Sequence, residues 1–136
     1  MDMTTAFAEL DWIAVVAAAV AAFFAGAIWF GPLFGKAWIA GFGFNEEELG
    51  GQNKIKIFGL TLVLNIVMAI NLAMFLGADP TVAFGTAAGF LTGFGFAAPL
   101  IGVYYLFEGR SARLFLINGG FAIINFTVMG AVIPAL

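Results

Sequence analysis

The chain has 136 residues, of which 63% are hydrophobic and only 10% charged, and its mean hydropathy is +1.08. A domain of this length cannot bury so much apolar surface in its own interior, so most of its exterior must face lipid. The net charge of −3 excludes a basic nucleic-acid surface, and the absence of cysteine and histidine removes disulfides, thiolate chemistry and the commonest metal ligand.

Charged residues divide the chain into four apolar stretches, each long enough for a helix to cross the hydrocarbon layer of a membrane. None of the four contains Asp, Glu, Lys or Arg, and such unbroken runs lack the alternating pattern of a β-barrel. We therefore predict an all-α polytopic membrane protein, with residues 1–136 forming a single transmembrane domain. The four spans of this four-transmembrane-helix bundle are expected at about residues 12–34, 57–76, 80–107 and 114–133.

A secretory signal peptide is the rival interpretation of the first stretch. It would need a basic leading region, whereas Asp2, Glu9 and Asp11 make this one acidic. The apolar run is also too long for a signal peptide, so we expect it to be retained as a span.

The segment at residues 35–56 is the only sizeable connection between the predicted spans. Asn45, followed three residues later by Glu48, has the arrangement of a capping box, so a short helix is predicted near residues 45–49. The consecutive acids at residues 46–48 would point in three directions on a helix, so we expect no metal site there.

All basic residues lie in the connections that follow the first and the third span. These residues are Lys36, Lys54, Lys56, Arg110 and Arg113. Because short loops rich in Lys and Arg remain in the cytoplasm, both connections are predicted to be cytoplasmic and both termini to lie outside.

Small residues at helical spacing predict where the spans approach each other closely. Gly85, Gly89 and Gly93 recur every four residues on the third span and form overlapping close-approach motifs. The first span has a weaker version of this pattern in Ala18, Ala22 and Gly26. The pattern leaves open whether these two faces meet each other or another copy of the chain.

Four asparagines lie within the predicted spans. They are Asn65 and Asn71 in the second span, and Asn118 and Asn125 in the fourth. Spacings of six and seven residues favour similar faces for the two members of each pair, and an amide in hydrocarbon needs a partner, so we expect all four to point inward. They would then form interhelical hydrogen bonds or, alternatively, line a polar pathway.

An offset of 67 residues aligns Ala21–Gly35 with Ala88–Gly102 without a gap. Six of the fifteen positions are identical, and Pro32 coincides with Pro99. This similarity fits a duplicated two-helix unit in the form of a parallel repeat, with chance matching in a biased composition as the alternative. Each half would have a proline near the end of its first span, where proline commonly kinks a helix.

A dense aromatic motif closes the first span. It comprises Trp29, Phe30, Gly31, Pro32, Phe34, Gly35, Lys36 and Trp38. This motif resembles the signature of a bacterial membrane family catalogued as domain of unknown function 1761, and the resemblance extends over Trp12–Leu49. Members often have Tyr at the position of Phe30, so no role of that hydroxyl carries over. The resemblance implies a small four-span protein of the bacterial inner (cytoplasmic) membrane and no particular activity.

These observations favour a non-catalytic membrane protein that acts through helix–helix contacts, as a homo-oligomer or as an accessory subunit of other membrane proteins. The alternative is a channel or carrier for a small solute or ion, with a pathway lined by Asn and Thr. An enzyme is disfavoured because no base in the spans could activate a nucleophile. No cofactor is predicted, although apolar clefts for lipid, pigment or quinone need few polar groups.

Overall fold

The computed structural model describes residues 2–43 and 53–136, and within these ranges the chain forms helices joined by short turns, with no strand. The all-α fold is therefore confirmed. Four helical segments are long and apolar enough to cross a membrane, as expected of a multi-pass membrane protein. They are Trp12–Leu33, Lys54–Leu76, Val82–Glu108 and Ala112–Ala135.

The first and third of these segments are each built from more than one helix. In chain order the elements are α1 (Met3–Ala8), α2 (Trp12–Ile28), the π-helical turn η1 (Trp29–Leu33), α3 (Gly35–Phe42), α5 (Lys54–Leu76), α6 (Val82–Thr92), the π-helical turn η2 (Gly93–Ala97), α7 (Ala98–Glu108) and α8 (Ala112–Ala135). The predicted short helix near residues 45–49 lies outside the described residues.

Polar caps determine where the spans begin. A side-chain oxygen at each start accepts a hydrogen bond from an otherwise unpaired N–H in the first turn of the helix. The four capping residues are Asp11 for α2, Asn53 for α5, Thr81 for α6 and Ser111 for α8. Since Asn53 starts α5 before Lys54 and Lys56, the second span begins three residues earlier than the predicted 57, with both lysines in its first turn.

The two expected kinks occur as π-helical turns. Pro32 lies inside η1, and Pro99 follows two residues after the end of η2. Proline has no N–H and its ring crowds the preceding turn, so the backbone widens locally. In η1 the N–H of Phe34 accordingly bonds to the carbonyl of Trp29, five residues back, at 2.8 Å.

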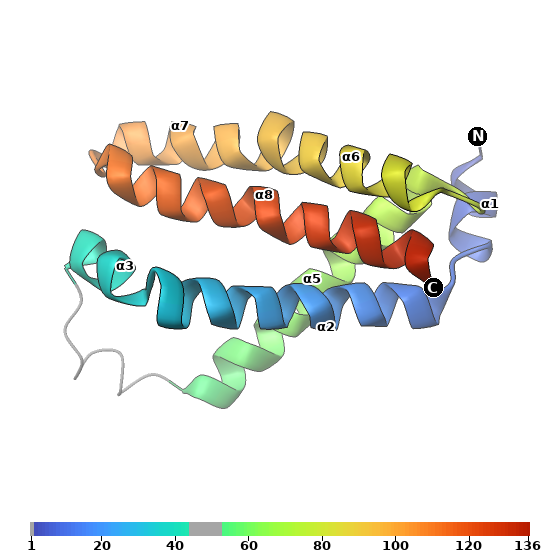
Figure 1. Ribbon diagram of the computed structural model, residues 1–136, viewed down its shortest axis with the longest axis horizontal. Helices are drawn as coiled ribbons and strands as arrows, with labels where there is room; N and C mark the ends of the chain where they lie inside the picture. Colours follow the sequence, from blue (N-terminus) through green and yellow to red (C-terminus); the bar gives the residue numbers. More distant parts are fainter. Residues whose placement is uncertain (1, 44–52) are drawn as a thin grey trace.

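The helices are arranged around α8. In Figure 1, α2, α8 and the line formed by α6 and α7 run lengthwise, whereas α5 crosses behind them obliquely. α8 packs against α6, η2 and α7 on one side and α2 on the other, while α5 packs mainly against α2. The duplication of a two-helix unit stays a prediction. The two halves differ in how closely their two helices approach each other.

The interior is built from small side chains and the exterior from large ones. Ala18, Ala22 and Ala69 are fully buried, whereas Leu106 and Phe107 are more than four-fifths exposed. Such an extensive apolar exterior indicates a surface that faces lipid. The described charged residues lie at or beyond the ends of the four long segments. We call the end of the bundle with α3 and the α7–α8 turn the basic end (Figure 1).

The start of the predicted connection at residues 35–56 is helical. α3 turns away from α2 after η1 and ends at Gly43, whose φ of +74° suits a glycine at a helix C-terminus. The basic end is therefore partly covered by a folded helix rather than by a loop alone.

Candidate functional site

The glycine face of the third span is covered by α8 of the same chain. A Cβ placed on Gly93 would lie 2.5 Å from the Cα of Ile123, and one on Gly85 or Gly89 would collide with the α8 backbone at Gly130 or Phe126. Only glycine allows this close approach between two helix backbones. The three predicted packing residues thus form an intrachain interface.

The small residues of the first span make a different contact. Ala18 and Ala22 are fully buried in one core cluster with Ala69 of α5. A Cβ on Gly26 would lie 3.1 Å from the ring of Phe121 on α8. The two predicted faces therefore do not meet each other, because each is covered by another helix of the chain. Gly130 of α8 is the partner of Gly85 and Gly89, and no glycine spacing in the fourth span indicated it.

Two of the four asparagines are buried as expected. Asn65 is 5% exposed, and its Nδ2 donates to the Ala19 carbonyl of α2 at 3.3 Å. Asn125 is 4% exposed, and its Nδ2 lies 3.8 Å from the Sδ of Met68 on α5. Its Oδ1 is buried and has no hydrogen-bond partner among the described residues.

The other two asparagines have different surroundings. Asn118 is half-buried and donates to the hydroxyl of Tyr105 on α7. Asn71 is exposed and donates to the Val67 carbonyl of its own helix at 2.8 Å. The expectation that Asn71 points inward with Asn65 was wrong, because six residues at 3.6 per turn place the two side chains about 120° apart.

A cleft opens where α5 diverges from α6 and η2. It has a volume of about 470 Å³. Its lining residues are Val67, Met68, Asn71, Leu72 and Phe75 of α5, Thr92 of α6, Phe96 of η2, and Phe126 of α8. Six of these eight side chains are apolar, and the two polar ones come from opposite walls. The oblique course of α5, visible in Figure 1, creates this cleft.

Both polar residues of the cleft already use one donor on their own helix. The Thr92 hydroxyl donates to the Ala88 carbonyl at 2.8 Å, and the Asn71 amide donates to Val67 as described. Such bonds within a helix let a polar side chain face hydrocarbon at low cost. The Asn71 carbonyl oxygen and one of its N–H groups remain available to a molecule in the cleft.

The aromatic motif ties the first span to α8 at the basic end. The Trp29 indole N–H donates to the Ile117 carbonyl at 2.9 Å. The rings of Trp29 and Phe34 lie 4.6 Å apart, and that of Phe30 lies 5.0 Å from Phe121 and 5.5 Å from Trp38. These contacts give the motif a structural role in joining η1, α3 and α8.

The remaining motif residues support this bend. Pro32 lies in the π-helical turn. A Cβ on Gly35 would lie 2.5 Å from the Phe30 carbonyl oxygen, so this bend requires glycine at position 35. Gly31 has open space around it, and Lys36 is exposed at the start of α3.

The cluster continues toward the α7–α8 turn. The Phe42 ring lies 6.4 Å from that of Tyr105, and the Arg110 guanidinium lies 4.4 Å above Phe42. Arg110 also forms an ion pair with Glu108 at 2.9 Å. A cation over an aromatic face and an exposed ion pair each contribute modestly, and together they hold α3 close to this turn.

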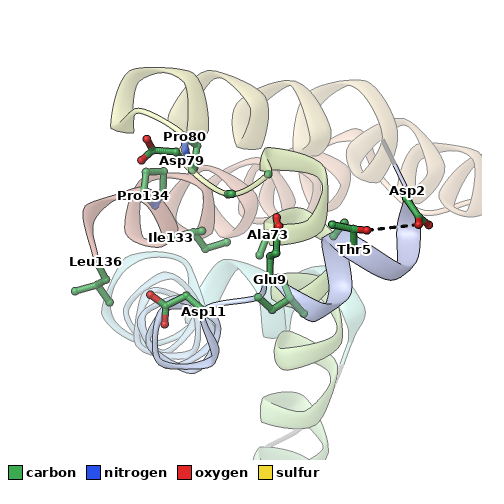
Figure 2. Close-up of a pocket in the computed structure, with 14 residues that line it drawn as sticks. Asp2, Thr5, Glu9, Asp11, Ala73, Asp79, Pro80, Ile133, Pro134 and Leu136 are labelled. Carbon is green, nitrogen blue, oxygen red and sulfur yellow. Dashed lines mark hydrogen bonds between the residues drawn. The ribbon is translucent and has the colours of Figure 1, made fainter.

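The opposite end has an acidic pocket of about 360 Å³ between α1, the α5–α6 turn and the end of α8 (Figure 2). Its carboxylates belong to Asp2, Glu9, Asp11 and Asp79. Asp2 and Asp11 cap α1 and α2, so two of the four have structural partners. No group of three His, Cys, Asp or Glu residues in the described chain is placed to hold a metal ion.

Comparison with known proteins gives one finding. No curated protein and no solved structure matches this chain. One family model, described as a protein of unknown function (DUF1761), matches residues 13–133, which cover all four membrane-spanning segments except their outermost residues. The chain therefore belongs to the DUF1761 family of proteins of unknown function.

Proposed function

We propose that this protein is a non-catalytic, multi-pass protein of the bacterial inner membrane that binds a small lipid-soluble molecule in the cleft between α5 and α6–η2. Binding of this kind is the first step required of a carrier. It develops the solute-carrier alternative rather than the helix-contact hypothesis.

The cleft is the observation that supports this proposal. Its 470 Å³ lie within the roughly 300–1,000 Å³ typical of small-molecule sites. Such sites are mostly apolar with a few placed polar groups, and here Asn71 and Thr92 supply them from opposite walls. The cleft lies between the C-terminal half of α5 and the middle part of the third span, so a ligand dissolved in the membrane can reach it.

The chemistry of the spans supports a non-catalytic role. The four helical segments have charged residues only at their ends, and the chain has neither histidine nor cysteine. In the described spans, the hydrogen bonds of the Thr and Asn side chains go to backbone carbonyls, the Tyr105 hydroxyl or Met68, and none goes to a group that could act as a base. A cleft lined by such groups can bind a molecule without transforming it.

Charge supports the proposed orientation. Lys36 lies at the start of α3 and Lys54 and Lys56 in the first turn of α5. Arg110 lies in the α7–α8 turn and Arg113 in the first turn of α8. These parts of the chain lie at the basic end of the bundle (Figure 1). The proposal therefore places this end in the cytoplasm and both termini outside.

The hypothesis of a homo-oligomer or an accessory subunit stays a prediction. Its original support was the glycine face, but Gly85, Gly89 and Gly93 are already covered by α8. Any contact with a second chain would have to use another face.

The test is native mass spectrometry of the protein extracted in lipid nanodiscs. Val67→Trp would fill the cleft from α5, whereas Val63→Trp would add the same side chain one turn earlier, at an exposed position outside the cleft. We expect a small molecule to remain bound to the wild type and to Val63→Trp but not to Val67→Trp. Equal retention by both variants, or a wild type that retains nothing even after lipid extract is added, would contradict the proposal.

A further inference from the structure

The buried amide of Asn125 lies directly behind the cleft. Its Nδ2 contacts Met68 Sδ at 3.8 Å, and Met68 itself lines the cleft. Phe126, the next residue on α8, is also part of the cleft wall. Only one flexible side chain therefore separates a polar group in the protein interior from the proposed ligand.

The hydrogen bonding of Asn125 is incomplete in this arrangement. Its Oδ1 is buried without a partner, and a thioether sulfur is a weak acceptor for its N–H. A buried amide normally has its polar atoms paired, because leaving them unpaired in an apolar interior costs free energy. An unpaired buried polar atom of this kind needs a physical explanation, and a ligand that pairs with it is one.

The side chain of Met68 can change its rotamer easily. It is unbranched with three rotatable bonds, and Met68 is only partly buried. A change of its rotamer would bring the Asn125 amide into contact with the cleft. Among the described residues, the Met68 side chain makes no hydrogen bond other than this weak contact with Asn125.

From these contacts, and resting on the proposed function, we infer that Asn125 is the polar anchor of the cleft and selects a neutral lipid-soluble alcohol. A hydroxyl both donates and accepts, so it can pair with Oδ1 and with Nδ2 of the same amide. An ether can only accept and leaves Oδ1 unpaired. No charged residue lines the cleft, which disfavours phosphate, carboxylate and ammonium groups in the bound part of the ligand.

The experiment compares two photoactivatable probes in nanodiscs, a long-chain alcohol carrying a diazirine and its methyl ether. Labelled peptides from α5, α6 and α8 are quantified by mass spectrometry. In the wild type we expect the alcohol to label the cleft about tenfold more than the ether, the ratio expected when one hydrogen bond to the amide is lost. In Asn125→Leu this preference should disappear. If Asn125→Leu does not assemble, Asn125→Ala, which adds no volume, has the same expected result.

Asn118→Leu is the matched control, because Asn118 is the other amide of α8 and contacts Tyr105 rather than the cleft. It should retain the preference for the alcohol. Equal labelling by both probes in the wild type, or a preference that survives in Asn125→Leu, would overturn the anchor while leaving binding in the cleft intact. Absence of cleft labelling by either probe would instead refute the proposed function itself.

Discussion

The two halves of the bundle join their helices in different ways. In the second half, α6 approaches α8 until the two backbones touch at Gly85, Gly89 and Gly130. In the first half, α2 and α5 pack through side chains, among them buried alanines, Leu72 and the amide of Asn65, rather than through their backbones. The glycine contacts hold α6 and α8 side by side and antiparallel, whereas the contact through side chains lets α5 cross α2 obliquely and leave a cleft beside it. The close α6–α8 interface thus fixes the positions of these two helices, and the looser α2–α5 interface leaves space for a ligand.

The largest expected effect is at the glycine interface. In Gly89→Ala the added Cβ would lie 2.8 Å from the carbonyl carbon of Phe126, and backbone rather than a flexible side chain would have to move. We expect the free energy of unfolding, measured by SDS titration in mixed micelles, to fall by about 3 kcal/mol. Gly59→Ala on α5, where nothing lies within 4 Å, is the control and should be neutral or stabilising by up to about 1 kcal/mol.

If both substitutions had the same effect, the close approach of α6 to α8 would be wrong. Gly89→Leu should abolish assembly of the monomer itself, and not merely self-association. A folded, monomeric Gly89→Leu variant would show that the glycine face is free for another chain.

A smaller loss is expected at the alanine interface. Ala18→Leu adds three carbons to a fully buried position, but α5 has few contacts beyond α2 and can shift. We expect a loss of about 2 kcal/mol in the same titration, since overpacking is partly relieved by movement. Ala17→Leu, on the outer face of α2, should change stability little. A loss larger than that of Gly89→Ala would reverse the proposed order of the two interfaces.

The comparison also shows what could be predicted from the sequence. The four spans follow from the lengths of uncharged apolar runs, because lipid requires each run to be a helix. The glycines at 85, 89 and 93 correctly indicated a close contact. Their partner could not be predicted, because of the three glycines in α8 only Gly130 faces them, and a glycine spacing does not indicate which helix will cover it.

The site was predicted only in part. Asn125 was recognised as a polar group in a span, and threonine only as a residue type that could line a pathway. The cleft depends on the oblique course of α5, which arises from packing and has no local sequence signal. Nothing in the sequence distinguishes Met68 and Phe96 from the other apolar residues of their spans. Asn71 was placed on the wrong face, because a spacing of six does not repeat on a helix.

A hydrogen bond from Trp29 attaches the first half of the bundle to α8. Trp29→Phe keeps an aromatic ring beside Phe34 but removes the N–H that donates to the Ile117 carbonyl. We expect a loss of about 1 kcal/mol, the usual net value of such a bond. Trp12→Phe, at a half-exposed position of α2, is the control. Equal values would indicate that the indole N–H contributes nothing beyond ring packing.

The smallest effect is expected within the loose interface. Asn65→Leu removes the amide that bonds to the Ala19 carbonyl at 3.3 Å, and hydrogen bonds between helices in membranes contribute about 0.6 kcal/mol on average. Asn71→Leu removes an exposed amide that bonds only to its own helix, so it should leave stability unchanged or slightly raised. The difference between these two substitutions on one helix, measured by SDS titration, isolates the contribution of the buried amide. If Asn71→Leu proved more destabilising than Asn65→Leu, then α5 would have to present its other face to α2, and the cleft would disappear with it.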